Sequence, residues 1–243
     1  MLKRLLTVSA LAVLVFACVP QMHAAVTMTF TDGTNCVTIV GSAAPVTCPT
    51  FASGWSFTDS QFGGPHGTMI ASGTIGAFTL NITTGRGGVA ETRPALINLN
   101  SINVNSGGAG TLTIMFSDDQ YLDFSPLLNL SSSGTIIAGT AVGSSISFNG
   151  EVNTLNIGTL GPFTQTSASS ATSAAATANF ANPDGSSGTL LQTVVLAFTG
   201  GGEIDSGFTI ANVAVPEPAS IVFLGTAVLG LTALIRKKRV KRS

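Results

Sequence analysis

Apolar and polar residues alternate with a period of two along the middle of the chain. In Phe78–Ile82 (FTLNI) the apolar side chains are separated by Thr79 and Asn81, and Thr111–Phe116 (TLTIMF) alternates in the same way. Because successive side chains of a β-strand point to opposite faces of a sheet, this alternation indicates half-buried strands. Leu190–Phe198 (LLQTVVLAF) is apolar on both faces, which predicts a central strand.

Short runs rich in Gly, Asn, Asp and Ser separate these segments, as turns do between strands. About a dozen such strands fit into roughly 190 residues, and no stretch before the C-terminal apolar run has a helical period. The pattern therefore predicts an all-β chain, with a single β-sandwich or jelly-roll-like ectodomain over residues 26–214 and a C-terminal transmembrane helix.

The alternation changes phase once, within residues 95–105 (ALINLNSINVN). Leu99 and Ile102 are both apolar although they lie three residues apart. One extra residue near Asn100–Ser101 would return both to the same face, and a β-bulge supplies such a residue. We therefore predict a bulge at this point.

Residues 165–188 are rich in Ser, Ala and Thr and show no firm periodicity. This segment is expected to be either a flexible connection or an edge strand. Because the strand that follows is strongly apolar and must return to the core, the segment does not divide the domain.

Residues 1–25 have the order of a secretory signal peptide. Two cations precede the apolar stretch Leu5–Ala17, and the small residues Ala24 and Ala25 follow it. We expect a Sec-type signal that is removed after Ala25 or one residue earlier. Two alternatives stay open: a lipoprotein-type cleavage at Cys18, and an N-terminal helix that is not cleaved.

Ala219–Ile235 is an apolar run without a charged residue, close to the lower limit of about 17 residues for a bilayer-spanning helix. The alternative, a buried core helix, conflicts with the cations that follow immediately. The tail, residues 236–243, contains these cations: Arg236, Lys237, Lys238, Arg239, Lys241 and Arg242. By the positive-inside rule they retain the tail in the cytoplasm, which predicts a single-pass C-terminal anchor.

The sequence Val215-Pro216-Glu217-Pro218 lies directly before this run. The prolines keep the chain extended, and Pro218 suits the first position of a helix. Motif, apolar run and basic tail together closely resemble the PEP-CTERM sorting signal of Gram-negative bacteria, also catalogued as the ice-binding protein C-terminal domain. The resemblance covers residues 215–243. It implies cleavage by an exosortase, transfer from the cytoplasmic membrane to the cell surface or matrix, and association with exopolysaccharide and biofilms.

The net charge of −1 conceals an acidic exported part. Between residues 26 and 214, Arg86 and Arg93 are the only basic residues against ten carboxylates, a balance of about −8. This balance argues against nucleic acid or anionic lipid as a partner. The surface must instead be made polar by Ser, Thr, Asn and Gly.

Cys36 and Cys48 are the cysteines that remain after removal of the signal peptide. An even pair in an exported chain is typical of a disulfide, which would stabilise the fold by roughly 3 kcal/mol in the chain-entropy model. Metal ligation is the alternative, although no second cysteine pair or nearby histidine accompanies them.

An aromatic–hydroxyl–aspartate pattern occurs in residues 30–32, 57–59 and 116–118. The simplest interpretation is an inward aromatic side chain that closes a strand, followed by an Asp that begins a turn by bonding the backbone. Calcium is the alternative, since hard cations bind several oxygens, although the spacing matches no standard calcium loop. Its candidate ligands lie in the expected loop SDDQYLD: Asp118, Asp119 and Asp123. No other cofactor is expected.

The sequence contains no catalytic signature, so an enzyme is not expected. It has no G-x-S-x-G motif, and His66, in the glycine-rich run GGPHG, is typical of a solvated turn. Gly85–Gly88 (GRGG) is not followed by a helical pattern that could cradle phosphate. Trp55 and Tyr121 are candidate aromatic platforms for a sugar, with burial of Trp55 in the core as the alternative.

Two classes of function are compatible with these features. The favoured one is a structural cell-surface or matrix protein that packs among exopolysaccharide. The alternative is a specific binding module for glycan, calcium or ice. Ice recognition would require a flat and regular threonine array, and the pairs Thr27/Thr29 and Thr111/Thr113 are too few in the sequence to show one.

Overall fold

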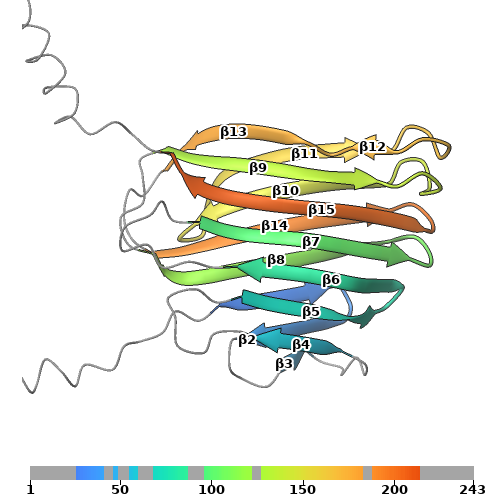
Figure 1. Ribbon diagram of the computed structural model, residues 1–243. Coiled ribbons are helices and arrows are strands. Elements are labelled where there is room, and N and C mark those ends of the chain that lie inside the picture. The colour runs from blue at the N-terminus through green and yellow to red at the C-terminus, as the bar shows by residue number, and fades with distance from the viewer. Residues whose placement is uncertain are drawn as a thin grey trace, which may run out of the picture.

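The chain folds into two antiparallel β-sheets that pack face to face (Figure 1). The computed structural model describes residues 26–40, 46–48, 55–59, 68–86, 96–121, 127–182 and 188–213. Within these ranges it contains fifteen strands and no helix, and therefore no helix long and apolar enough to span a bilayer. The predicted signal peptide, sorting motif and transmembrane helix lie outside the described residues.

The strands are, in chain order, β1 (Thr27–Thr31), β2 (Cys36–Val40), β3 (Val46–Cys48), β4 (Ser56–Asp59), β5 (Thr68–Ile75), β6 (Phe78–Arg86), β7 (Leu96–Ser106), β8 (Gly110–Tyr121), β9 (Leu127–Ile136), β10 (Ser145–Val152), β11 (Leu155–Thr164), β12 (Thr172–Ser173), β13 (Ala176–Ala181), β14 (Gly188–Phe198) and β15 (Gly202–Asn212).

One sheet has seven strands in the order β11-β10-β14-β8-β1-β2-β3. The other has eight, in the order β12-β9-β15-β7-β6-β5-β4, and β13 pairs with β9 beside β12. The predicted all-β sandwich is confirmed, with a few more strands than the dozen expected. The additional strands include β3 and β12, which are only three and two residues long and too short to show a period.

The core lies between the sheets and is filled by alternate side chains of β1, β2, β5 to β11, β14 and β15. Phe148 of β10 meets Phe208 of β15 with ring centroids 5.4 Å apart, and Phe78 of β6 meets Phe198 of β14 at 5.7 Å. Tilted aromatic pairs at these separations add specific packing to their buried area. Because each pair joins one sheet to the other, these rings fix the two sheets face to face.

The predicted central strand is confirmed, since β14 lies between β10 and β8 in the middle of the seven-stranded sheet. It carries one fully buried polar side chain, Gln192. The Gln192 amide Nε2 donates hydrogen bonds to the carbonyl oxygens of Ile97 on β7 (3.1 Å) and Phe208 on β15 (2.9 Å). The amide nitrogen thus finds its partners in the opposite sheet, while the buried Oε1 of Gln192 has no hydrogen-bond partner among the described residues.

The predicted β-bulge is also confirmed. Leu99 and Ile102 of β7 are both buried, while Asn100 and Ser101 between them are exposed and together oppose the single residue Gly207 of β15. Ser101 adopts a left-handed backbone conformation with φ of 55°. The extra residue keeps the apolar side chains on either side of the bulge directed at the core.

Edge strands cover one open side of the sandwich. Of the two structures expected for residues 165–188, the edge strand is the one observed, as β12 and β13 along β9. The ring of Phe180 on β13 lies so close to Gly158 on β11 that a Cβ at this glycine would collide with it. The contact brings the edges of the two sheets together, while residues 183–187 lie outside the described ranges.

The turn between β1 and β2 follows the expected aromatic–hydroxyl–aspartate pattern. Phe30 is buried, and the Asp32 carboxylate accepts hydrogen bonds from the backbone N–H groups of Thr34 (2.9 Å) and Asn35 (2.6 Å). Although burial raises the pKa of Asp32, the hydrogen bonds from Asn35 and Thr34 outweigh it, and the pKa is lowered overall.

Replacement of Ser101 tests the bulge. We expect Ser101→Gly to leave the free energy of unfolding unchanged or to raise it by up to about 1 kcal/mol, because glycine adopts a positive φ without steric cost. Ser101→Val should lower it by about 1–2 kcal/mol, since a β-branched residue is strained there. Ser147→Val, on an outward position of β10, is the matched control. Denaturant unfolding in which both valine variants behave alike would rule out the strained conformation.

The contribution of the Asp32 carboxylate to the free energy of unfolding should depend on pH. A carboxyl with a lowered pKa in the folded state stabilises the fold fully above its unfolded value near 3.9, and this contribution is lost as the pH falls through the folded pKa. We therefore expect Asp32→Asn to be less stable than the parent at about pH 6, with the difference shrinking towards about pH 2. The measurement is the urea midpoint across this range. For the exposed control Thr111→Ala, the difference in urea midpoint from the parent should not depend on pH. If the difference for Asp32→Asn were also independent of pH, the stabilising role of the Asp32 charge would be refuted.

Candidate functional site

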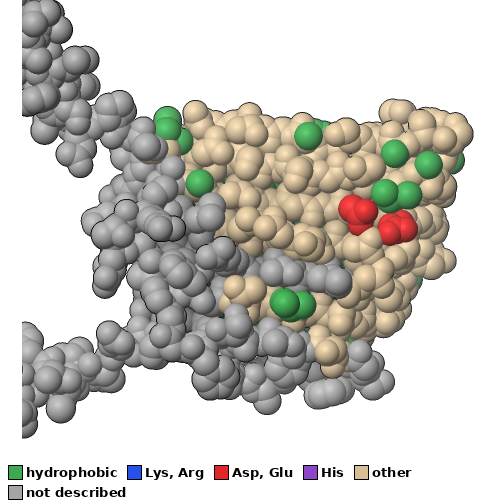
Figure 2. Space-filling model, in the orientation of Figure 1, with side chains coloured by type: hydrophobic (Ala, Val, Ile, Leu, Met, Phe, Trp, Pro, Cys, Tyr) green, Lys and Arg blue, Asp and Glu red, His purple; other side chains and the backbone are tan. Residues whose placement is uncertain are grey.

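The outer face of the eight-stranded sheet is a polar surface built from four adjacent strands. Its outward residues on β6, β7, β15 and β9 include Asn81, Asn98, Asn100, Asn103, Asn105, Asn129, Ser131, Ser133, Thr135, Glu203, Asp205 and Thr209. Figure 2 shows this face with few hydrophobic side chains and a local group of acidic ones, and none of its described side chains is a Lys, Arg or His. We refer to it as the polar face.

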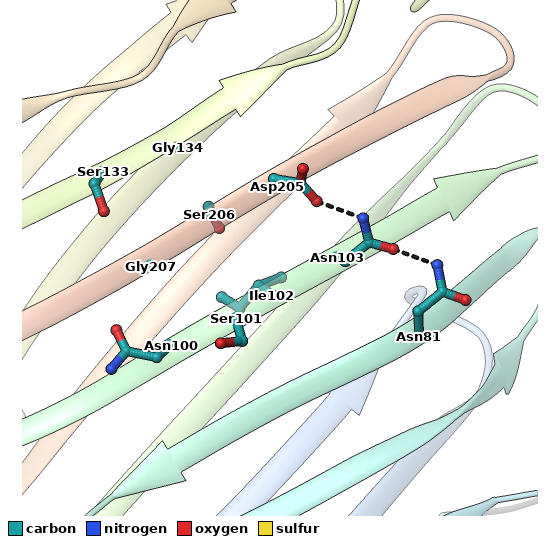
Figure 3. A pocket seen from close by; sticks show the side chains of 10 residues that line it. All are labelled: Asn81, Asn100, Ser101, Ile102, Asn103, Ser133, Gly134, Asp205, Ser206 and Gly207. Carbon is teal, nitrogen blue, oxygen red and sulfur yellow. Dashed lines mark hydrogen bonds between the residues drawn. The ribbon is translucent and has the colours of Figure 1, made fainter.

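Four side chains of the polar face form one hydrogen-bonded group, the asparagine–carboxylate cluster: Asn81, Asn103, Glu203 and Asp205. The amide Nδ2 of Asn103 donates to Asp205 Oδ1, and its Oδ1 accepts from Asn81 Nδ2 (Figure 3). The same Nδ2 also donates to Glu203 Oε1 (2.7 Å). Because carboxylates can only accept when ionised, the Asn103 amide nitrogen must face them. The Asn103 side chain is therefore held by hydrogen bonds at both its amide nitrogen and its amide oxygen.

Strand register brings the cluster together. Asn103 on β7 lies directly opposite Asp205 on β15. Two residues further along the same ladder, Asn105 lies opposite Glu203. Asn81 lies on β6 at an irregularity of the β6–β7 ladder, between Leu80 and Ile82. Residues from three strands therefore meet on one face, although Asn103 and Asp205 are separated by about a hundred positions in the chain.

The backbone beneath Glu203 is held by a buried hydroxyl group. Thr140 is fully buried, donates from Oγ1 to the Glu203 carbonyl oxygen (3.0 Å) and accepts from the Glu203 N–H (3.0 Å). The Glu203 carbonyl oxygen also accepts from the Ile137 N–H (3.0 Å), so the Thr140 hydroxyl supplements the backbone pairing at the start of β15. The acidic end of the cluster consequently rests on a rigid support.

An open groove of about 560 Å³ runs beside the cluster, over β6, β7, β15 and β9. The bulge residues Asn100 and Ser101 border it together with Asn103 and Asp205 (Figure 3). Gly207, opposite the bulge, has no side chain to fill the space. The bulge and the glycine therefore produce the hollow in an otherwise continuous strand surface.

The groove offers amide, hydroxyl and carboxylate groups to a ligand. Asparagine amides both donate and accept hydrogen bonds, serine and threonine hydroxyls do the same, and carboxylates accept strongly. This donor and acceptor set is matched by a ligand with many hydroxyl groups. Within the described ranges, no three His, Cys, Asp or Glu side chains converge as metal ligands.

The structure corrects the loop expected around the candidate calcium ligands. Asp118 and Asp119 are not loop residues but the ninth and tenth residues of strand β8. Asp118 is buried, with an exposed fraction of 2%. The expected loop does not begin at Asp118, because strand β8 continues to Tyr121. Asp123 lies outside the described residues.

The cysteines lie on neighbouring strands. Cys36 begins β2 and is disulfide-bonded, and Cys48, the last residue of β3, lies directly opposite it in the ladder. The linkage is therefore placed at the sheet edge formed by β2 and β3, away from the polar face.

Trp55 is half-buried and packs against the core. Its ring packs against Phe30 with centroids 4.8 Å apart, and its indole Nε1 donates to the Thr74 carbonyl oxygen (3.1 Å). The Tyr121 side chain and His66 lie outside the described residues. The same is true of Val215–Pro218 and of the cations of residues 236–242.

The two threonine pairs named for ice come from adjacent strands, β1 and β8. Thr31 lies opposite Thr113, and Thr29 bonds Thr38 of β2 through their hydroxyl groups (3.0 Å). Met115 lies opposite Thr29, however, so the row is interrupted. The outer face of the seven-stranded sheet is therefore not a regular threonine array.

The asparagine–carboxylate cluster was not identified from the sequence. The sequence does show asparagines that alternate with apolar residues around the bulge: Asn98, Asn100, Asn103 and Asn105. Their link to Glu203 and Asp205 depends on which strands pair, and a single sequence does not show this.

No protein-family model and no curated protein matches the chain. Among solved structures, it is similar to TmCBM61 in complex with β-1,4-galactotriose (10% identity, TM-score 0.32, 65% of this chain and 88% of that one). It is also similar to the xylan-binding module CBM15 (9% identity, TM-score 0.33, 67% and 100%). A third is the infectious bursal disease virus Gx strain structure (10%, TM-score 0.35, 81% and 58%). These likenesses concern the β-sandwich fold alone, and no ligand is assigned from them.

Proposed function

We propose that this chain is an exported cell-surface or matrix protein whose β-sandwich contacts polysaccharide through the groove on its polar face. The observation that carries the proposal is the asparagine–carboxylate cluster beside that groove. It places fixed donors and acceptors from three strands at one accessible position, which is how a rigid scaffold orients a polar ligand.

The charge of the groove favours an uncharged glycan. Glu203 and Asp205 lie on the same outward side of β15, and no described cation accompanies them on the polar face. A polymer with uronic acid or sulfate groups would bring like charge against these carboxylates. A neutral polysaccharide would meet only hydrogen-bonding partners.

The openness of the surface favours many weak contacts over one tight site. The groove is hollowed in a sheet face instead of being enclosed by loops, so a bound sugar would keep much of its hydration. Repeated contacts of this kind act together along a polymer by raising the effective concentration. The proposed role is accordingly adhesion within an exopolysaccharide matrix, without catalysis.

The sorting part of the proposal rests on the chain termini. The signal-like residues 1–25 would direct export, and Val215–Pro218 with the apolar run Ala219–Ile235 would hold the protein in the cytoplasmic membrane until an exosortase releases it. This part is supported by the order of motif, apolar run and cations, and by the resemblance they carry.

Glycan binding should depend on Asn103. We expect the exported protein to bind neutral polysaccharides on a glycan array in preference to uronic acid polymers, with and without a calcium chelator. Asn103→Ala should weaken binding roughly tenfold, since it removes bonds on both sides of the cluster. Asn149→Ala is the matched control, because Asn149 makes similar side-chain bonds on the opposite sheet. An equal loss in both variants, or no binding at all, would eliminate this groove as the site.

Processing should depend on the motif. Replacement of Pro216, Glu217 and Pro218 by alanine leaves the apolar run intact, so we expect export to continue while full-length protein accumulates in the cytoplasmic membrane. Removal of residues 236–242 should instead weaken retention and release unprocessed protein. Fractionation and the mass of the C-terminus distinguish these defects. Trimming of the triple variant at the parental rate would reduce the motif to a linker.

A further inference from the structure

The two ends of the sandwich differ in which segments leave them. β14 and β15 are joined by the tight turn at residues 199–201, and this marks one end, the turn end. β15 runs from this turn to Asn212 at the opposite end, the tail end (Figure 1). β1 also starts at the tail end, because Thr27 lies opposite Ser117 of β8, and Ser117 lies opposite Leu191 near the start of β14. Both membrane-directed segments of the sequence therefore join the fold at one end.

The connection to the proposed anchor is short. β15 is paired to its last residue, and the N–H of Val213 donates to the Leu127 carbonyl oxygen (3.0 Å), so the folded domain extends to Val213. The apolar run begins at Ala219. Six Cα steps span at most about 20 Å, even when fully extended.

The length of the domain exceeds this reach. β15 has eleven residues, which at the rise of a strand corresponds to about 33 Å. To bring the turn end to the bilayer, the connection would have to run back along this length, and it is too short to do so. The tail end must remain beside the membrane.

Charge opposes one other orientation that the short connection allows, in which the domain lies on its polar face. Glu203 and Asp205 occupy that face without a described cation. Anionic lipid headgroups repel such a surface once it comes within the Debye length of about 8 Å. A domain that stands on its tail end keeps these carboxylates away from the lipids, since Asp205 is seven residues, or about 23 Å, from Asn212.

We infer that, before processing, the sandwich stands on its tail end at the outer surface of the membrane, with the glycan groove, near the middle of β15, held away from the lipids and open to the surroundings. This inference rests on the anchor in the proposed function. It adds that the anchored precursor can already contact polysaccharide, because neither the bilayer nor the connection covers the groove.

Energy transfer in proteoliposomes tests the orientation. Two exposed aliphatic residues flank β10: Val142 precedes it near the turn end and is exposed by 55%, and Leu155 begins β11 at the tail end and is exposed by 48%. The mature full chain, residues 26–243, is labelled with a donor fluorophore at Val142→Cys or Leu155→Cys. The bilayer contains anionic lipid and an acceptor on its headgroups. The chain without an added cysteine gives the labelling background from the native cysteines.

We expect transfer from Leu155→Cys to exceed that from Val142→Cys by about twofold or more, because β10 separates the two ends by about 23 Å. Insertion of about twenty Gly/Ser residues after Val213 should abolish the difference, since the domain could then turn freely. Equal transfer from the two labels in the parental chain, or the reverse order, would overturn the orientation.

Flotation of the same liposomes separates this result from the proposed function. A chain that floats with the lipid but shows equal transfer is anchored and not upright, so only the orientation fails. A chain that does not float has no anchor, and both the orientation and the membrane step of the proposed function fall with it.

Discussion

The β-bulge at Asn100 and Ser101 is the constraint on which the middle of the eight-stranded sheet depends. Side chains alternate strictly along a strand, so without the extra residue either Leu99 or Ile102 would point to solvent. The bulge keeps both in the core and preserves the contact of β7 with β15 on each side. The same irregularity sets two residues opposite Gly207 and so opens the groove on the outer face. Core packing and candidate site therefore have one common origin.

Buried polar groups then determine how the sheets are held. Gln192 reaches from the centre of one sheet to carbonyl groups of two strands in the other, and one of them, on Phe208, borders the bulge region. The Thr140 hydroxyl binds both the N–H and the carbonyl oxygen of Glu203 at the start of β15. Such groups contribute little net stability when satisfied but are costly when displaced. They favour one register of the two sheets over alternatives that an apolar core alone would accept.

The alternation of residues predicted the strands, the central position of Leu190–Phe198 and the bulge, because each depends only on local sequence and burial. The role of Asp32 as a turn residue was equally local. The mistaken loop at Asp118 and Asp119 arose because polar residues can continue a strand when its partner, β14, runs beside it. Trp55 could not be assigned between core and surface, since its neighbour Phe30 belongs to a distant strand.

Long-range pairing explains why the asparagine–carboxylate cluster escaped prediction. Asn81, Asn103 and Asp205 are individually ordinary strand residues, and only the order β6-β7-β15 brings them together. The strand β15 also connects the cluster to the C-terminal end of the domain. The cluster lies near the start of β15, and the chain leaves for its apolar run at the other end of the same strand. In the proposed function, this strand separates the surface that would meet polysaccharide from the end that the anchor would hold beside the membrane, so that contact with the matrix would not have to wait for release.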